Sequence, residues 1–154
     1  ETYSHTISKK IVDFALKHKA KYINLEYLKG SNFDDKILRN WSYYKLQQYI
    51  TYKAAKYGIE VRYVNPCFTS QVCSNCGNFE EGQRSEQEKF KCANEICRFH
   101  NLKKGYINAD FNAARNIAKS TLFINKKNEK RDNLIKEAAE YYGIPWKDEE
   151  EDAA

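Results

Sequence analysis

The 154-residue sequence contains no methionine, no apolar run long enough to cross a membrane and no signal-peptide pattern at its start. A chain without methionine is expected to be a fragment of a longer protein, and processing after translation is the alternative. The other two absences argue against a membrane-embedded or secreted protein. The five cysteines are an odd number, and with no secretory signal this argues against a disulfide framework.

Composition and charge favour a globular, nucleic-acid-binding chain. Hydrophobic residues make up 42% of the sequence, which is enough to bury a core in one domain with a small insert. The net charge is +5, but residues 148–152 are all acidic, and without them 26 basic and 16 acidic residues leave a balance of +10. A basic, aromatic-rich body favours a nucleic-acid partner, although a basic surface with no such partner stays open. The acidic run is predicted to be a solvated tail.

Residues 8–65 show a helix, strand, helix, strand periodicity, which predicts a βαβ unit with a helix in front of it. The first strand covers 22–28 and places Glu26 on the face opposite Ile23. The segment 30–35 is predicted to be a loop, and Pro66 ends the second strand, 59–65. The expected apolar stripes are Ile11, Val12, Ala15 and Leu16 on the first helix, and Leu46, Ile50, Ala54 and Tyr57 on the second. Asn40 or Ser42 is expected to cap the second helix, and Gly58 to end it.

Four cysteines occur as two pairs with the spacing of a metal-binding ribbon: Cys73, Cys76, Cys92 and Cys97. A Cys-x-x-Cys turn presents two thiolates to one ion, and zinc prefers four such ligands in a tetrahedron. The second pair is two residues wider than usual, so His100 is an alternative to Cys97 as fourth ligand. Cys67 lies outside both pairs and is predicted to be a small packed residue.

The segment between the two pairs, 77–91, is polar and long enough for a short hairpin. It offers almost no core of its own, so a structural zinc is expected to hold it together.

The stretch "NADFNAARNIAKS" predicts a further helix, with Asp110 at its head and one apolar face. The expected apolar face is formed by Phe111, Ala114, Ile117 and Ala118. On helix physics alone, Asp110 is an N-cap and Glu26 is an exposed strand residue. As a pair they are two carboxylates at one edge of an α/β sheet, which is the usual place for a site. A terminal helix, which includes "NLIKEAAEYYG", and the acidic tail complete the chain.

The ordered motifs "LEYL", "NWSYYKLQQYITYKAAKYG", "CSNCGN" and "NADFNAARNIA" resemble the C-terminal half of the RuvC-type nuclease in miniature type V CRISPR effectors and their transposon-encoded relatives, the TnpB family. The resemblance covers residues 4–120. It implies an α/β fold, a partial RuvC (RNase H-like) fold with an inserted zinc ribbon. The implied segments are a RuvC-like region over residues 1–66, the ribbon over 67–106, the final RuvC-like helix over 107–122, and a C-terminal helix and tail over 123–154.

By this resemblance, Glu26 matches the second catalytic acid and Asp110 the third. Arg84, eight residues before the third cysteine, matches an arginine that assists at the active site. The first catalytic aspartate belongs to a D-x-G strand motif, which this sequence lacks. The resemblance therefore implies that the N-terminal region of the same polypeptide, with the first acid, is missing. A chain with two of the three acids is expected to be inactive alone.

The implied activity is Mg²⁺-dependent hydrolysis of DNA by an RNA-guided endonuclease in the prokaryotic cytoplasm. Two Mg²⁺ ions about 4 Å apart would be held by carboxylates, and guide RNA and target DNA would be the partners. Some miniature effectors are homodimers, so a homodimer is a further expectation. The ribbon, with Arg84, Lys89, Lys91, Arg98 and Phe99, is expected to guide single-stranded DNA; otherwise it is a structural clip. The alternative function is a zinc-ribbon binding module on an inert α/β scaffold.

Overall fold

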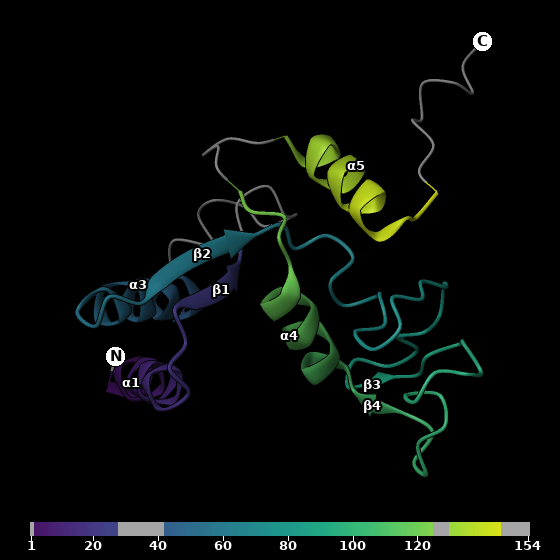
Figure 1. The fold of residues 1–154 in the computed structure, drawn as a ribbon, viewed down its shortest axis with the longest axis horizontal. Coiled ribbons are helices and arrows are strands. Elements are labelled where there is room, and N and C mark those ends of the chain that lie inside the picture. Colours follow the sequence, from purple (N-terminus) through teal and green to yellow (C-terminus); the bar gives the residue numbers. More distant parts are fainter. Residues whose placement is uncertain (1, 28–41, 125–129, 146–154) are drawn as a thin grey trace. The chain divides into compact units, whose positions relative to one another are not determined.

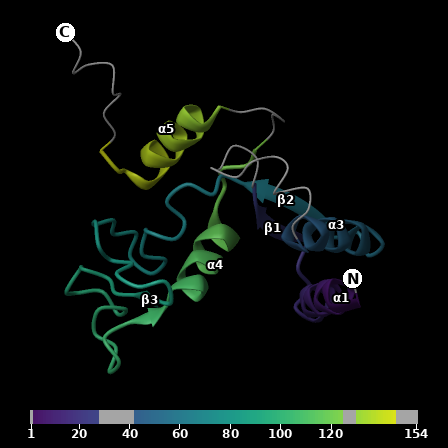
Figure 2. The ribbon, with the colours of Figure 1, turned by 180° about the vertical axis from the view of Figure 1, so that it is seen from behind.

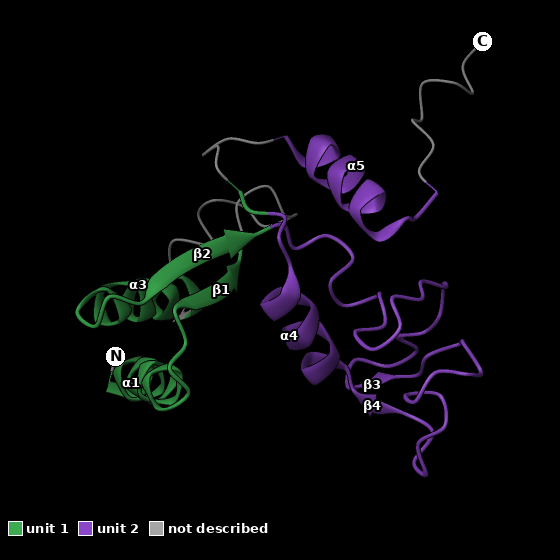
Figure 3. Ribbon diagram, viewed as in Figure 1, with its two compact units in different colours: residues 1–64, 123–128 green, residues 65–122, 129–154 purple. Residues whose placement is uncertain are grey.

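The computed structural model describes residues 2–27, 42–124 and 130–145 (Figure 1). The loop at 30–35, Asn40 and the acidic run 148–152 lie outside these residues. The chain divides into two compact units, residues 1–64 with 123–128 and residues 65–122 with 129–154 (Figure 3). None of the described helices is long and apolar enough to cross a membrane.

The first unit is a βαβ unit preceded by a helix, which confirms the predicted order (Figures 1 and 2). Its elements are α1 (Thr2–Lys17), β1 (Tyr22–Glu26), α3 (Ser42–Ala55) and β2 (Glu60–Val64). The two strands are parallel and in register from Tyr22 opposite Glu60 to Glu26 opposite Val64. Phe123 forms an antiparallel bridge with Val64 of β2, and the Ile124 N–H donates to the Tyr63 carbonyl at 2.9 Å.

One apolar cluster joins both helices to one face of this sheet. Its buried members are Val12, Ala15, Ala54 and Ile59, with Ala20, Ile23 and Val61 packed against them. The predicted stripes are wrong at their ends, because Leu16 and Tyr57 are exposed. Tyr57 lies beyond the end of α3, where Gly58 adopts φ +70° and turns the chain into β2, as its position predicted.

The opposite face of the sheet carries Glu26 and a cation stacked on aromatic rings. The Arg62 guanidinium lies 3.4 Å from the Tyr22 ring centroid and 5.1 Å from that of Phe123, and it pairs with Glu60 at 3.1 Å. In-register residues of parallel strands share a face, so Glu26 lies on the same side as Arg62. The predicted alternation of β1 is therefore confirmed.

The second unit contains the cysteine pairs, a two-stranded ladder and two helices. β3 (Lys89–Phe90) pairs antiparallel with β4 (Ile107–Asn108), so the strand before the second cysteine pair joins the residues just after it. No strand ladder is described within 77–91 itself, although the chain folds back there and the Lys91 N–H donates to the Gln83 carbonyl at 2.7 Å. α4 (Ala109–Lys119) follows β4 directly, and α5 (Arg131–Tyr142) ends at Gly143 in the left-handed conformation.

Candidate metal centre and acidic residues

The four paired cysteines converge, as their spacing predicted. The sulfur atoms of Cys73, Cys76, Cys92 and Cys97 all lie within 4.8 Å of one another. The Cys73 and Cys97 sulfurs are 3.8 Å apart, and those of Cys76 and Cys92 are 3.6 Å apart. A tetrahedral zinc with Zn–S bonds of about 2.3 Å needs sulfurs about 3.8 Å apart, whereas a disulfide needs about 2.05 Å. The group therefore fits one metal ion such as zinc, and all five cysteines are free thiols.

Local turns bring the four thiol groups close to one another. In the first pair, the Cys73 N–H donates to the Asn78 carbonyl at 2.9 Å, and Gly77, at φ +79°, returns its N–H to the Cys73 carbonyl at 2.8 Å. The two additional residues of the second pair form a turn, in which the Asn94 side chain accepts from the Ile96 N–H at 3.2 Å. The wider spacing therefore leaves the thiol positions intact.

The alternative fourth ligand, His100, is not part of the four-sulfur group. The His100 ring Nδ1 lies 2.7 Å from the Cys92 carbonyl oxygen, so His100 supports the backbone of a ligand rather than replacing Cys97. Cys67 is half-buried and lies outside the four-sulfur group, as expected.

The thiols differ in how readily they ionise. Burial raises the pKa of the Cys73 and Cys92 thiols. Burial also acts on Cys97, but the Phe99 N–H and the Asn75 amide donate to its sulfur, and its pKa falls to about 6. N–H donation to sulfur stabilises the thiolate form, which is the form that binds a metal.

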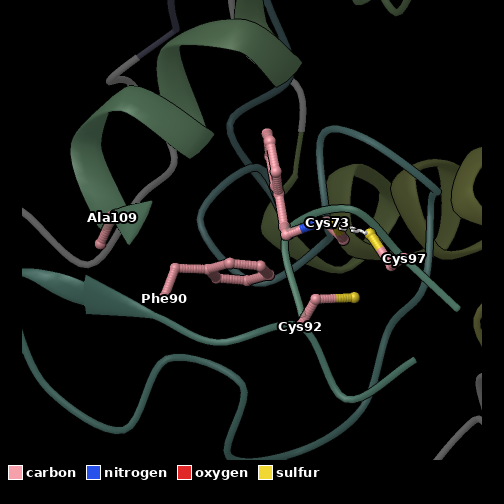
Figure 4. Packing of buried hydrophobic residues seen from close by; sticks show 6 residues of the cluster. Cys73, Phe90, Cys92, Cys97 and Ala109 are labelled. Carbon is pink, nitrogen blue, oxygen red and sulfur yellow. Dashed lines mark hydrogen bonds between the residues drawn. The ribbon is translucent and has the colours of Figure 1, made fainter. Parts of the chain in front are cut away.

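The segment 77–91 has almost no core of its own, as expected, since only Gln83 and Phe90 in it are buried, but the ribbon as a whole has a small core. Phe90 is fully buried and lies between the cysteines and Ala109 of α4 (Figure 4). The buried cluster contains Cys73, Phe90, Cys92, Cys97, Phe99 and Ala109, with Leu102 and Ile107 against it. Phe99 is thus a core residue, and its predicted role in base stacking is wrong.

Gln83 is buried within the ribbon, although the sequence around it is polar. Its side-chain nitrogen donates to the Gln71 and Asn78 carbonyls at 3.2 and 3.0 Å, and its oxygen accepts from the Ala93 N–H at 2.9 Å. Hydrogen bonds of one side-chain amide therefore connect the segments that contain the two cysteine pairs. A glutamine in a polar stretch gives no periodic signal of burial, so sequence reasoning could not find it.

Asp110 is not the cap of its helix, which corrects the simplest interpretation of this residue. The N-cap is Asn108, whose side-chain oxygen accepts from the Phe111 N–H at 2.9 Å. Asp110 lies two residues further on, in the first turn, with its side chain 84% exposed. Its carboxylate is thus available to a ligand and is placed where a helix N-terminus favours negative charge.

Arg84 reaches this carboxylate from the ribbon. One guanidinium nitrogen lies 3.7 Å from Asp110 Oδ1 and donates to the Gln87 carbonyl at 2.7 Å. An exposed pair of this length adds little stability. The pair matters for another reason: it brings two of the three predicted active-site residues close together within the second unit.

Glu26, the other predicted acid, ends β1 in the first unit. The buried side chain of Gln47 on α3 donates to the Glu26 carbonyl at 3.0 Å and so fixes the end of the strand. The pKa of Tyr43, one turn earlier on α3, is raised by burial and by the charge of Glu26. Glu26 thus has a fixed backbone and a tyrosine in its electrostatic range.

Exposed aromatic rings with neighbouring cations lie close to Asp110 in the sequence, and of these residues only Lys89 was expected to contact DNA. Phe111 is 55% exposed, and the Arg115 guanidinium lies 5.8 Å from its ring centroid. Tyr106 is also exposed, with the Lys89 ammonium 5.2 Å from its centroid. Rings and cations of this kind suit contacts with bases and phosphates.

Taken together, a parallel βαβ unit and a four-cysteine group that fits one metal ion describe a protein of mixed α/β structure. Residues 43–117 match the family model described as the Cas12f1-like TNB domain. The Cas12f1 CRISPR-associated endodeoxyribonuclease of Sulfoacidibacillus thermotolerans is 44% identical over 119 residues, which is 77% of this chain and 26% of that protein. A TnpB-like protein of Methanocaldococcus jannaschii is 39% identical over 50% of this chain and 30% of its own length.

A cryo-EM structure of a Cas12f1–sgRNA–target DNA complex shares the fold, with a TM-score of 0.61 and 29% identity. The match covers 79% of this chain and 34% of that chain. The chain therefore belongs to the family of miniature type V CRISPR effectors and TnpB-like proteins. It spans about a third or less of the length of each of these relatives.

Proposed function

We propose that this chain contributes two carboxylates and a zinc-bound ribbon to a RuvC-type, RNA-guided DNA endonuclease. The observation that carries the proposal is the approach of Arg84 to Asp110, because the motif match gives both residues roles at one active site. The fold of Cas12f1 in complex with sgRNA and target DNA supports the same assignment. Guide RNA and target DNA would be the partners of the assembled enzyme, in the cytoplasm of a prokaryotic cell.

In this proposal Cys73, Cys76, Cys92 and Cys97 hold a structural zinc, and Glu26 and Asp110 are ligands of catalytic Mg²⁺. Carboxylate oxygens are hard ligands, and the exposed Asp110 side chain fits an ion that keeps several waters. Bound Mg²⁺ supplies an activated water and stabilises charge at the scissile phosphate. Arg84 would bind a phosphate oxygen next to Asp110, and guide pairing would select the sequence.

The isolated chain should not cut DNA in the presence of Mg²⁺ and guide RNA. The D-x-G motif of the first acid does not occur in residues 1–154, so the metal ligands would be incomplete. Adding a separately produced segment with that motif should restore cleavage, measured on end-labelled DNA. Cleavage by the chain alone, stopped by Glu26→Gln, would contradict this and point to Asp34 or Asp35 as the third acid. Failure of every combination to cut would favour the binding module on an inert scaffold.

The chain should bind single-stranded DNA weakly, with an affinity that falls steeply as salt rises. Lys91→Glu or Arg84→Glu should weaken binding, and each lost phosphate contact should reduce the salt slope by about 0.7. Phe111→Ala should weaken binding with the slope unchanged, because stacking releases no counterions. Lys17→Glu on α1 is the matched charge reversal in the other unit. If Lys17→Glu has the largest effect, the ribbon is a structural clip and not the DNA contact.

A further inference from the structure

Two of the three buried residues of α4 are polar, whereas its sequence predicts an apolar face. Asn112 and Asn116 are buried, whereas Phe111 and Ala114 are exposed. A buried amide must be hydrogen-bonded to offset its loss of water. The hydrogen-bond partners of these two asparagines therefore show which segment α4 packs against.

Both asparagines form hydrogen bonds with the backbone that leads into the first cysteine pair. The Asn112 side chain accepts from the Ser74 N–H at 2.8 Å and donates to the Val72 carbonyl at 2.9 Å, so it bonds the residues on both sides of Cys73. One turn later, Asn116 donates to the Val72 and Thr69 carbonyls at 2.7 and 2.9 Å. The Lys119 ammonium, in the last turn, donates to the Ser74 carbonyl.

The chemistry of these contacts requires an amide. Asn112 must accept from one peptide and donate to the next, and among short side chains only asparagine offers both groups in one plane. A carboxylate at the same place keeps the acceptor but turns an oxygen towards the Val72 carbonyl. Aspartate at either position therefore loses the hydrogen bond to the Val72 carbonyl with little change of volume.

We propose that Asn112 and Asn116 are positioning residues that couple metal loading of the ribbon to the placement of Asp110 at the start of α4. A metal on Cys73 fixes the peptides on either side of it, and the asparagines transmit that order to the helix. Ala109 packs in the cluster around Phe90. The first turn of α4 therefore contacts the same core that contains three of the paired cysteines. The role assigned to Asp110 rests on the proposed function, whereas the coupling itself does not.

Hydrogen exchange of the 154-residue chain, with zinc and after chelation, tests the coupling directly. Zinc should protect the backbone amides of α4 at least tenfold in the unchanged chain. Asn112→Asp and Asn116→Asp should keep about one zinc per chain but lower this protection about tenfold, and Asn133→Asp, an exposed position on α5, should not. Equal protection of α4 with and without zinc, or in all variants, would overturn the proposal. So would loss of zinc from both Asn112→Asp and the milder Asn112→Ser, because the asparagine would then serve the metal site itself.

A second measurement separates positioning from simple destabilisation. In the guide-loaded nuclease, Asn112→Asp should raise the Mg²⁺ concentration for half-maximal cleavage several-fold and leave the KM for DNA unchanged. An unchanged Mg²⁺ requirement would remove the link to Asp110. If Asp110→Asn still cuts while the exchange coupling is observed, the proposed function fails and the coupling stands.

Discussion

Asp110→Asn should reduce DNA cleavage by the guide-loaded nuclease at least about a hundredfold, and Glu26→Gln should do the same. Each change replaces a charged oxygen ligand by an amide that binds Mg²⁺ poorly. Metal stabilisation of the transition state is worth several kcal/mol, and each ~1.4 kcal/mol is a factor of ten in rate. Guide and DNA affinity should change little, because extended phosphate contacts dominate binding. Single-turnover cleavage and filter binding on the same samples measure the two effects.

The chain provides a close control for the first of these changes. Asp132 occupies the second position of α5, as Asp110 does in α4, and it is likewise exposed. Asp132→Asn therefore removes the same charge from the same place in a helix, at a residue to which no catalytic role is assigned. Cleavage at an unchanged rate is expected for this variant. Near-normal cleavage by Asp110→Asn would show that its carboxylate serves only the ion pair with Arg84 and the helix N-terminus.

The elements with regular periodicity could be predicted from the sequence. The parallel βαβ unit followed from alternating strand residues and a helix that ends at Gly58, because both signals are local. The four-cysteine group followed from ligand spacing, which the two added residues before Cys97 did not disturb. In these cases, the signal for each strand, helix end or cysteine pair lies within a short stretch of sequence.

The errors share a cause. Burial was predicted from the polar or apolar character of each residue, without knowledge of the residues that contact it. Asn112 and Asn116 are buried because peptide groups 38 to 47 residues away satisfy them, and Gln83 is buried because peptide groups 5 to 12 residues away satisfy it. Phe90, in a charged stretch, is buried because the cysteine cluster and Ala109 surround it. Long-range contacts of this kind leave no periodic signal. The sequence places the helix cap two positions late because both Asn108 and Asp110 are good caps, and only geometry separates them.

Cys76→Ser should remove zinc from the chain and unfold the ribbon, while the βαβ unit stays folded. Structural zinc contributes ~10–16 kcal/mol, so one ligand of four is worth about 3 kcal/mol and its loss weakens binding about a hundredfold or more. The remaining core consists of Phe90, Phe99 and few other apolar groups, and three of its buried members are themselves ligands. The separate cluster of α1, α3 and the parallel strands contains no ligand cysteine.

Metal analysis and amide NMR spectra of the same sample measure both aspects of this result. Signals of the ribbon and of α4 should collapse, because the asparagine contacts join them, and those of β1 and β2 should persist. Cys67→Ser is the control, since Cys67 is a half-buried thiol outside the four-sulfur group. It should retain about one zinc and the complete spectrum. A Cys76→Ser chain with full zinc content would leave three sulfurs and another donor as the site, and His100→Ala would then identify it.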